Sequence, residues 1–362
     1  MARPTKIILD LAAACHNLQR VKEIAPGSAV LAMVKANAYG HGLTRIALAL
    51  SDADAFGVAC VEEGLQLREA GVTRPIVLME GLFQSEELAY VERERFTLVV
   101  HHPEQVAMLE KHTQQQPISV WMKINTGMNR LGFDFSQVQT IHQRLMNCKA
   151  VSKPIGLMTH FAKADSQDKT ITLQQIEKFM AITAHLPGPR SLANSPGILA
   201  YPTAHADWVR PGLMLYGASP FAETVGLEYG LQPVMTLSSS LIAVYPAVKG
   251  SEIGYGGTWI CPEDMLMGVV GIGYGDGYPR HAENGTPVLV NGKVCPLIGR
   301  VSMDMLAVDL RSQPNAKVGD PVILWGAGLP VEVIAKHSGT VAYELLTRMT
   351  QRVRLVIKNS NK

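Results

Sequence analysis

From the start of the chain to about residue 230, short apolar runs alternate with helical patterns, and this rhythm limits the fold more than any other feature. The runs are continuously apolar, as parallel strands covered on both faces are. They lie at Ala29–Val34, Phe56–Cys60, Pro75–Met79, Phe96–Val100, Ile118–Ile124 and Ile155–His160. The helical patterns that follow them lie at Leu43–Leu50, Glu62–Ala70, Ser85–Arg93, Pro103–Lys111, Phe135–Met146 and Leu173–Ala184. Repeated strand-then-helix units predict an α/β fold, and so many units favour a TIM-like (β/α)8 barrel over the competing doubly wound open sheet.

Beyond about Leu231 the chain becomes β-rich, and glycine and proline punctuate it. The β-type runs lie at Val234–Tyr245, Met265–Ile272, Pro287–Val290, Val294–Ile298, Met305–Leu310, Pro321–Leu324 and Val353–Ile357, and helical patches lie at Val331–His337 and Tyr343–Gln351. Asn291-Gly292 between two apolar runs predicts a hairpin, because both central residues of a type I′ turn need positive φ. We therefore expect residues 1–231 to form the barrel and residues 232–362 to form a mostly-β C-terminal domain.

The charge balance and the cysteines exclude several classes of protein. Lys and Arg number 33 and Asp and Glu number 31, a formal net charge of +2, so neither a nucleic-acid footprint nor a polybasic membrane anchor is expected. No apolar stretch approaches the roughly 18 residues of a membrane span, and the apolar run at the start is too short for a signal peptide. The five cysteines lack the short spacing of a metal or redox motif. The sequence thus predicts a cytoplasmic protein that binds no nucleic acid, membrane or metal.

One lysine lies at the end of a predicted barrel strand, where barrel enzymes carry their catalytic residues. Lys35 follows an apolar run and precedes the glycine-containing segment that ends at Gly42. The carboxyl end of a barrel strand faces the active-site mouth, and a partly desolvated lysine there has a lowered pKa and can form a Schiff base with a carbonyl cofactor. For a lysine taken alone, a solvated strand end is the commoner explanation.

The whole run Val34–Gly42 resembles, residue for residue, the segment that carries the cofactor lysine in alanine racemases. Further segments resemble that family in its own order: Lys123–Phe133, Thr159–Phe161, Asn194-Ser195, Val209–Leu213, Tyr216-Gly217, Gly254–Gly257, Gly273–Arg280 and Val301–Met305. The resemblance implies a (β/α)8 barrel followed by a β-domain, with pyridoxal 5′-phosphate as cofactor. It implies an isomerase that interconverts L-alanine and D-alanine, and a homodimer with shared active sites.

The resemblance assigns two bases. Lys35 would bind the cofactor aldehyde and act on one face of the substrate, and Tyr255 would act on the other. Racemisation needs both, because a proton leaves one face of the α-carbon and returns to the opposite face. Free lysine and tyrosine titrate near 10.4 and 10, so nearby cations or desolvation must lower those values. A tyrosine among glycines is otherwise most often a turn aromatic.

Other roles follow from the same resemblance. Arg210 would meet the ring nitrogen of the cofactor, and His160 would couple Arg210 to Tyr255. Without the resemblance, the commoner explanation of Arg210 is a partner in a surface salt bridge, and that of His160 is a buried histidine of the core. The remaining cofactor ligands would be Tyr39, Asn194, Ser195, Gly212, Leu213 and Tyr343, most of them around the phosphate.

Arg130 would bind both the phenolic oxygen of the cofactor and the substrate carboxylate, which suits its bidentate fork. Met303 would meet the substrate from the other subunit. Lys123 would carry a carbamate that orients Arg130, or else stay an unmodified lysine. The entryway to the site would include Asp165, Tyr274 and Arg280.

Three alternatives stay open beside the alanine racemase. They are a racemase of another small amino acid such as serine, a non-catalytic carrier of pyridoxal phosphate, and an amino-acid decarboxylase of the related barrel fold. Tyr255 argues against the carrier. Arg210 argues against the decarboxylase, where an acidic partner of the ring nitrogen is expected. The sequence does not separate D-alanine supply for the cell wall from L-alanine breakdown.

Overall fold

The computed structural model describes residues 3–113 and 115–358, and the chain divides into two compact units. One comprises Asn17–Ala38 and Gly42–Leu215, and we call it the barrel unit. The other comprises the residues up to His16, Tyr39–His41 and the chain from Tyr216 onward, and we call it the β-rich unit. The boundary at residue 231 stays a prediction about domain extents.

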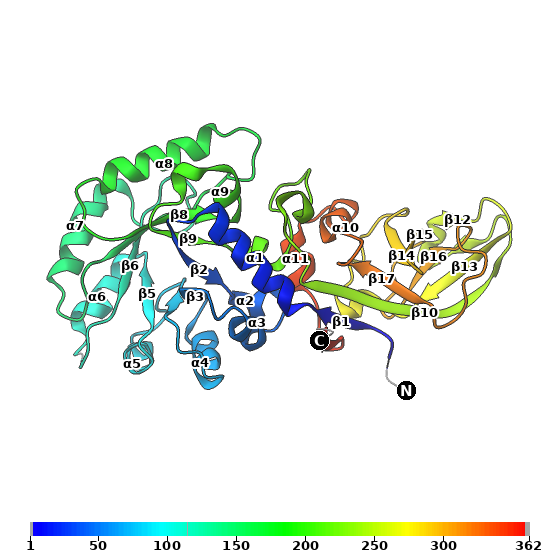
Figure 1. Cartoon of the computed structure of the whole chain (residues 1–362), viewed down its shortest axis with the longest axis horizontal. Coiled ribbons are helices and arrows are strands. Elements are labelled where there is room, and N and C mark those ends of the chain that lie inside the picture. The colour runs from blue at the N-terminus through cyan, green and yellow to red at the C-terminus, as the bar shows by residue number, and fades with distance from the viewer. Residues whose placement is uncertain (1–2, 114, 359–362) are drawn as a thin grey trace. The chain divides into compact units, whose positions relative to one another are not determined.

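Eight parallel strands close the barrel (Figure 1). They are β2 (Ala29–Met33), β3 (Ala55–Val58), β4 (Ile76–Leu78), β5 (Thr97–Val100), β6 (Val120–Lys123), β7 (Gly156–Met158), β8 (Arg190–Asn194) and β9 (Trp208–Arg210). The last strand pairs with the first through Ala29 and Trp208, which closes the ring and excludes the open sheet. The predicted barrel is confirmed. Its last two strands, β8 and β9, were absent from the predicted runs.

Helices alternate with these strands, as the rhythm predicts. They are α1 (Leu11–Ile24), α3 (Leu43–Ala49), α4 (Val61–Glu69), α5 (Leu88–Arg93), α6 (Pro103–Lys111), α7 (Phe135–Asn147), α8 (Thr170–Thr183) and α9 (Ser195–Ala200). Helix α7 begins at a capping box, in which Asp134 caps the helix start and the Gln137 side chain accepts from the Asp134 amide. Within the described ranges, none of the helices has both the length and the apolar character that crossing a membrane requires.

The β-rich unit is built on one eight-stranded sheet in the order β13-β16-β15-β14-β17-β10-β1-β18. The strands are β13 (Met265–Val270), β16 (Leu306–Asp309), β15 (Lys293–Ile298), β14 (Pro287–Val290), β17 (Pro321–Trp325), β10 (Met235–Ala247), β1 (Lys6–Leu9) and β18 (Arg354–Ile357). The mostly-β prediction is confirmed, and so is the hairpin, with Asn291 and Gly292 both at positive φ.

The first strand of the chain completes this sheet. β1 pairs antiparallel with β10 and parallel with β18, so that Lys6 faces Arg354 in the register. Two short helices, α10 (Val331–His337) and α11 (Ala342–Thr347), and a small pair of strands, β11 (Glu252–Ile253) and β12 (Trp259–Ile260), complete the unit.

Candidate active site

The carboxyl end of the barrel gathers the predicted site residues of the barrel unit. Lys35 comes two residues after β2 ends, and Lys123 and Arg210 are the last residues of β6 and β9. His160 follows β7 and Ser195 follows β8. Because the carboxyl ends of parallel barrel strands open on one face, these residues lie at the same end of the barrel although they are far apart in the sequence.

Lys35 opens a segment, labelled α2 (Lys35–Tyr39), that is one turn of left-handed helix. Its next four residues, Ala36, Asn37, Ala38 and Tyr39, have φ between 51° and 54°. Left-handed backbone costs residues other than glycine roughly 1–2 kcal/mol each. Such strain is kept only where surrounding contacts enforce it, and it clusters at functional sites. No local pattern in the sequence predicts this turn, since alanine favours ordinary right-handed helix.

Arg210 is buried, with only 3% of its surface exposed. Its guanidinium donates to Ser191 Oγ at 2.7 Å, and to the backbone oxygens of Thr159 at 2.6 Å and Leu192 at 3.2 Å. Nη2 also lies 3.4 Å from Nδ1 of His160. These acceptors are all uncharged, so they fix the orientation of the guanidinium without neutralising it.

Burial lowers the pKa values of three groups at this end, Lys123, His160 and Arg210, and nearby cations lower the first two further. Burial and the charges of Arg210, Arg130 and Lys35 lower the pKa of Lys123 to about 8. Burial and the same group of cations hold the pKa of His160 well below its ordinary value, so the imidazole is neutral at pH 7. Burial lowers the pKa of Arg210 to about 10, which leaves it protonated at pH 7. The site is therefore strongly positive and suits an anionic ligand.

The side chain of Asn125 holds the loop that carries Arg130. The Asn125 side-chain oxygen accepts from the amides of Gly127 at 3.1 Å and Asn129 at 3.0 Å. Gly132 has φ 125°, and a Cβ there would lie 2.8 Å from the backbone nitrogen of Asn125. The turn thus needs glycine at this position, and it leaves Arg130 exposed.

A small polar cradle follows β8 and β9. Ser195 Oγ accepts from the amides of Gly212 at 2.9 Å and Met214 at 3.4 Å. Leu213 begins a short 3-10 helix, and the first amides of a helix have no intrahelical acceptor. The Asn194 side chain accepts from Gly197, which caps α9. The cradle brings Ser195, Gly212 and Leu213 together, while Asn194 has a capping role in this structure.

Two residues at this end of the barrel were missed by the sequence analysis. Glu80 follows β4, and its charge acts on Lys123 against the effect of the neighbouring cations. His101 follows β5, and its Nε2 lies 2.8 Å from the Glu80 backbone oxygen. Burial lowers the pKa of His101. Their place directly after two predicted barrel strands was the available signal.

In the β-rich unit, Tyr255 stands in a tight turn between β11 and β12, with 69% of its surface exposed. Gly254, Gly256 and Gly257 all have positive φ, so this turn requires its glycines. A Cβ on Gly254 would lie 3.4 Å from the backbone nitrogen of Arg300, which places the turn beside the segment that leads to Met303.

Met303 and Tyr274 lie on two loops that hold each other. The amide of Tyr274 donates to Ser302 at 3.0 Å, and that of Gly275 donates to Met303 at 2.9 Å. Met303 is half exposed, and Tyr274 is exposed to 36%. The structure thus brings Tyr255, Tyr274 and Met303 onto neighbouring loops of one unit.

Tyr39 and Tyr343 also meet in the β-rich unit, with ring centroids 6.1 Å apart. Tyr39 stacks on Tyr216 at 4.8 Å, and burial raises the pKa of Tyr39 to about 12, so its hydroxyl stays a hydrogen-bond donor at neutral pH. Arg280 borders an open hollow of about 610 Å³ together with Arg300. Asp165 is exposed in the loop after β7.

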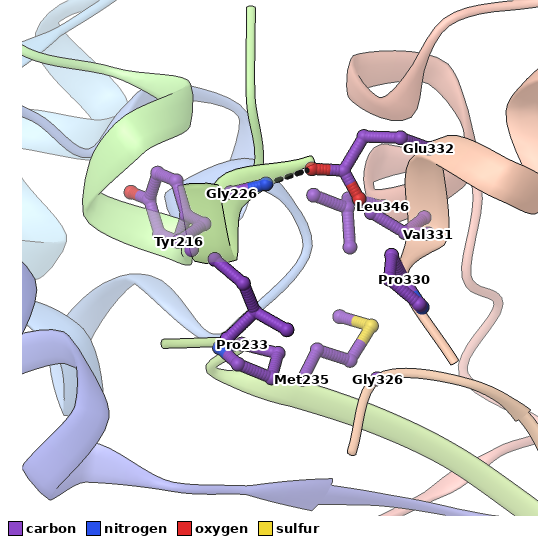
Figure 2. Close-up of a pocket in the computed structure, with 11 residues that line it drawn as sticks. Tyr216, Gly226, Pro233, Met235, Gly326, Pro330, Val331, Glu332 and Leu346 are labelled. Carbon is purple, nitrogen blue, oxygen red and sulfur yellow. Dashed lines mark hydrogen bonds between the residues drawn. The ribbon is translucent and has the colours of Figure 1, made fainter. Parts of the chain in front are cut away.

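The β-rich unit also contains a small, partly open cavity of about 20 Å³ (Figure 2). Tyr216, Met235 and Leu346 contribute to its mostly apolar lining. Glu332 beside it accepts from the amides of Gly226 at 2.8 Å and Ser219 at 2.7 Å, so this carboxylate holds a loop. A space of this size takes about one water molecule, and none of the predicted site residues lines it.

The chain combines a closed parallel barrel, whose carboxyl end is cationic, with a separate β-rich unit. These features define a class of barrel enzymes with a site for an anionic ligand. A model of the alanine racemase N-terminal domain matches residues 9–220, and a model of the C-terminal domain matches residues 234–357. The chain belongs to the alanine racemase family.

Individual relatives agree over nearly the whole length. The alanine racemase of Coxiella burnetii is 54% identical over 361 residues, which are 98% of this chain and 99% of that protein. The biosynthetic alanine racemase of Escherichia coli O6:H1 is 51% identical over 348 residues, 96% and 97% of the two chains. The crystal structure of biosynthetic alanine racemase from Pseudomonas aeruginosa has a TM-score of 0.96 at 45% identity, covering 99% of this chain and 100% of that one.

Proposed function

We propose that this protein interconverts L-alanine and D-alanine with pyridoxal 5′-phosphate as cofactor. The observation that carries the proposal is the group of cations at the carboxyl end of the barrel: Lys35, Lys123, Arg130 and Arg210. Four positive charges close together, one of them fully buried, are costly unless an anion joins them. A cofactor with a phosphate and a phenolic oxygen, together with a substrate carboxylate, supplies that anionic charge.

We assign donors of this chain to each group of the cofactor. Lys35 would hold its aldehyde, Arg210 its ring nitrogen and Arg130 its phenolic oxygen. The phosphate would be held by neutral donors, namely Tyr39, Tyr343, Ser195, Gly212 and Leu213, with Asn194 supporting the helix start beside Ser195. Pyridoxal 5′-phosphate, when bound, supplies the electron withdrawal that makes the α-proton of an amino acid removable.

Two groups would move that proton. Lys35 Nζ would take or return it on one face of the α-carbon, and Tyr255 Oη on the other. Arg130 would bind the substrate carboxylate and Met303 would contact the substrate, which fixes the α-carbon between the two bases. We propose that Tyr255 and Met303 reach the site from the second subunit of a homodimer, and that Tyr274, Arg280 and Asp165 line the approach to it.

Arg210 and His160 set the protonation of the site. A guanidinium donates hydrogen bonds and cannot accept a proton, so the group that meets Arg210 stays unprotonated. Because Arg210 can only donate, Nδ1 of His160 is the acceptor in their contact, and the proton of the neutral ring is on Nε2. That N–H would then be available to donate to the oxygen of the Tyr255 that we propose comes from the second subunit.

A panel of amino acids tests the proposed function. Purified protein loaded with pyridoxal 5′-phosphate is expected to abolish the optical rotation of L-alanine and of D-alanine, reaching the same end point from either side. L-serine is expected to react more slowly, although a pocket discriminates weakly against a single added hydroxyl. Faster racemisation of serine would assign the chain to another substrate, and binding of cofactor without any racemisation would make it a carrier.

Lys123 is expected to carry a carbamate. A pKa near 8 leaves roughly one amine in ten neutral at pH 7, against about one in three thousand for an ordinary lysine. A neutral amine adds carbon dioxide and releases a proton, and the resulting anion would lie among Arg130, Arg210 and Lys35. Protein incubated with ¹³C-bicarbonate is therefore expected to show a carbamate signal by NMR, which weakens as the pH falls from about 8 to 6.

The matched control for this signal is Lys149, an exposed lysine. Lys149→Ala is expected to keep the carbamate signal, and Lys123→Ala is expected to lose it. A signal that survives in Lys123→Ala would place the modification elsewhere. The absence of any signal in the wild-type protein would mean that Lys123 stays unmodified.

A further inference from the structure

The left-handed turn after Lys35 is fixed at its far end by hydrogen bonds within its own segment. The amide of Ala38 donates to the Val34 oxygen at 2.7 Å, and the amide of Gly42 donates to the Asn37 oxygen at 2.9 Å. The Asn37 side chain accepts from the amide of Leu43 at 2.9 Å. These contacts explain how the turn ends, but they do not hold its first residue.

The first amide of the turn, that of Ala36, is held from outside the segment. It donates to Oε1 of Glu63 at 2.7 Å. Glu63 is the third residue of helix α4, and its other oxygen, Oε2, accepts from the amide of Ala59 at 2.8 Å. One carboxylate therefore joins the chain just after β2 to the chain just after β3.

The two strands that lead to these amides are themselves paired. Met33 lies opposite Gly57 in the register, and the amide of Val34 donates to the Gly57 oxygen at 2.9 Å. Glu63 thus continues the link between β2 and β3 by one more pair of hydrogen bonds, at the point where Lys35 leaves the sheet. A strained backbone conformation such as this turn is kept only when contacts of this kind enforce it.

We propose that Glu63 is a positioning residue for Lys35, whose carboxylate holds the first amide of the left-handed turn and so fixes the direction in which Lys35 leaves the barrel. This role rests on the proposed function only in that Lys35 is taken as the cofactor-binding base. The commoner role of an acidic residue in the first turn of a helix is to cap that helix and complement its dipole. The bond to Ala36 is additional to that role.

The chemistry of the two contacts specifies glutamate. Both partners are N–H donors, so both side-chain oxygens must accept. Glutamine keeps one accepting oxygen and replaces the other with an NH2 group, which cannot accept from an amide. Aspartate keeps two acceptors on a side chain one methylene shorter. Glu63→Gln therefore removes one bond of the pair with almost no change in volume, and Glu63→Ala removes both.

The neighbouring residue Glu62 provides the matched control. It lies in the same first turn of α4 and carries the same charge, and its side chain contacts the thiol of Cys60. Glu62→Gln removes the same charge from the same helix end and leaves the Ala36 contact in place. An effect of helix capping or dipole alone would appear in both glutamine variants, and an effect of positioning only at Glu63.

The experiment compares the holoenzymes of wild type, Glu62→Gln, Glu63→Gln and Glu63→Ala. Hydrogen-exchange mass spectrometry is expected to show at least about tenfold faster exchange in the peptide spanning Ala36 for both Glu63 variants, with the other barrel peptides unchanged. Because a misplacement of about 1 Å costs on the order of 100-fold in rate, kcat is expected to fall roughly 10- to 100-fold, most in Glu63→Ala. KM for alanine is expected to change less than about threefold.

Three results would overturn the proposal. They are unchanged exchange at Ala36 in both Glu63 variants, an equal loss of kcat in Glu62→Gln, and faster exchange throughout the barrel, which would make Glu63 a general stabilising residue. Failure of the proposed function is distinguishable from these results. In that case the wild-type protein would not racemise alanine, while local exchange at Ala36 would still rise in the Glu63 variants.

Discussion

Replacing Lys35 with alanine is expected to lower kcat for alanine racemisation at least about 10³-fold. The variant loses both the amine that would hold the cofactor and one of the two bases, and a positioned base alone contributes roughly 10²- to 10⁴-fold. The rate is measured in both directions, from L-alanine and from D-alanine, because either one needs both bases. Reduction with borohydride before digestion is expected to leave the cofactor on the Lys35 peptide of the wild-type protein.

Stability separates this loss from a loss of fold. Lys35 is one of the cations that lower the pKa values of Lys123 and His160, so its removal relieves repulsion. When the two proteins are compared without cofactor and without bicarbonate, so that Lys123 is an amine in both, Lys35→Ala is therefore expected to unfold at a temperature no lower than the wild type. Added methylamine is expected to restore part of the rate by supplying a free amine. Full activity in Lys35→Ala, or cofactor trapped on another lysine, would refute the assignment.

A heterodimer of two inactive variants is expected to recover about half of the wild-type activity. Lys35→Ala keeps Tyr255, and Tyr255→Phe keeps Lys35. If each site takes its lysine from one subunit and its tyrosine from the other, one site of the heterodimer has both defects and the other has none. Random mixing makes about half of the dimers heterodimers, so roughly one quarter of all sites recovers.

Co-expression with two different tags isolates that heterodimer. Each homodimer is expected to be nearly inactive, and it serves as the baseline. If Lys35 and Tyr255 of one chain act together, every site keeps one defect and the heterodimer shows no more activity than its parents. A chain that is monomeric at assay concentration would yield no doubly tagged fraction and would contradict the shared site directly.

The sequence predicts the barrel well because its strands are buried on both faces and therefore continuously apolar. It fails at β8 and β9, which end in Asn194 and Arg210 and so carry polar residues at the end of the barrel where the candidate site lies. It also fails at β1, because four residues have no local feature that reveals partners more than two hundred positions away. Long-range pairing is a property of the whole sheet.

For the candidate site too, some features can be predicted from the sequence and others cannot. The resemblance to a family names Lys35, Arg210 and Tyr255, and the strand ends of the barrel explain why the first two lie at the same end of it. No pattern in the residues announces the left-handed turn after Lys35, since three of its four residues have no preference for positive φ. Glu63 is equally hidden, because an acidic residue in the first turn of a helix is ordinary.

Because β1 pairs with both β10 and β18, the β-rich sheet can be completed only late in the synthesis of the chain. The strands of the barrel all lie between residues 29 and 210, so every strand partner in that ring has left the ribosome before the β-rich sheet is complete. The strand Lys6–Leu9 is made more than three hundred residues before its parallel partner Arg354–Ile357. At about 5–20 residues per second, the nascent chain carries this unpaired edge for tens of seconds. Such an edge is a place for wrong pairing between chains, and the charged Lys6 within it is the kind of residue that discourages such pairing.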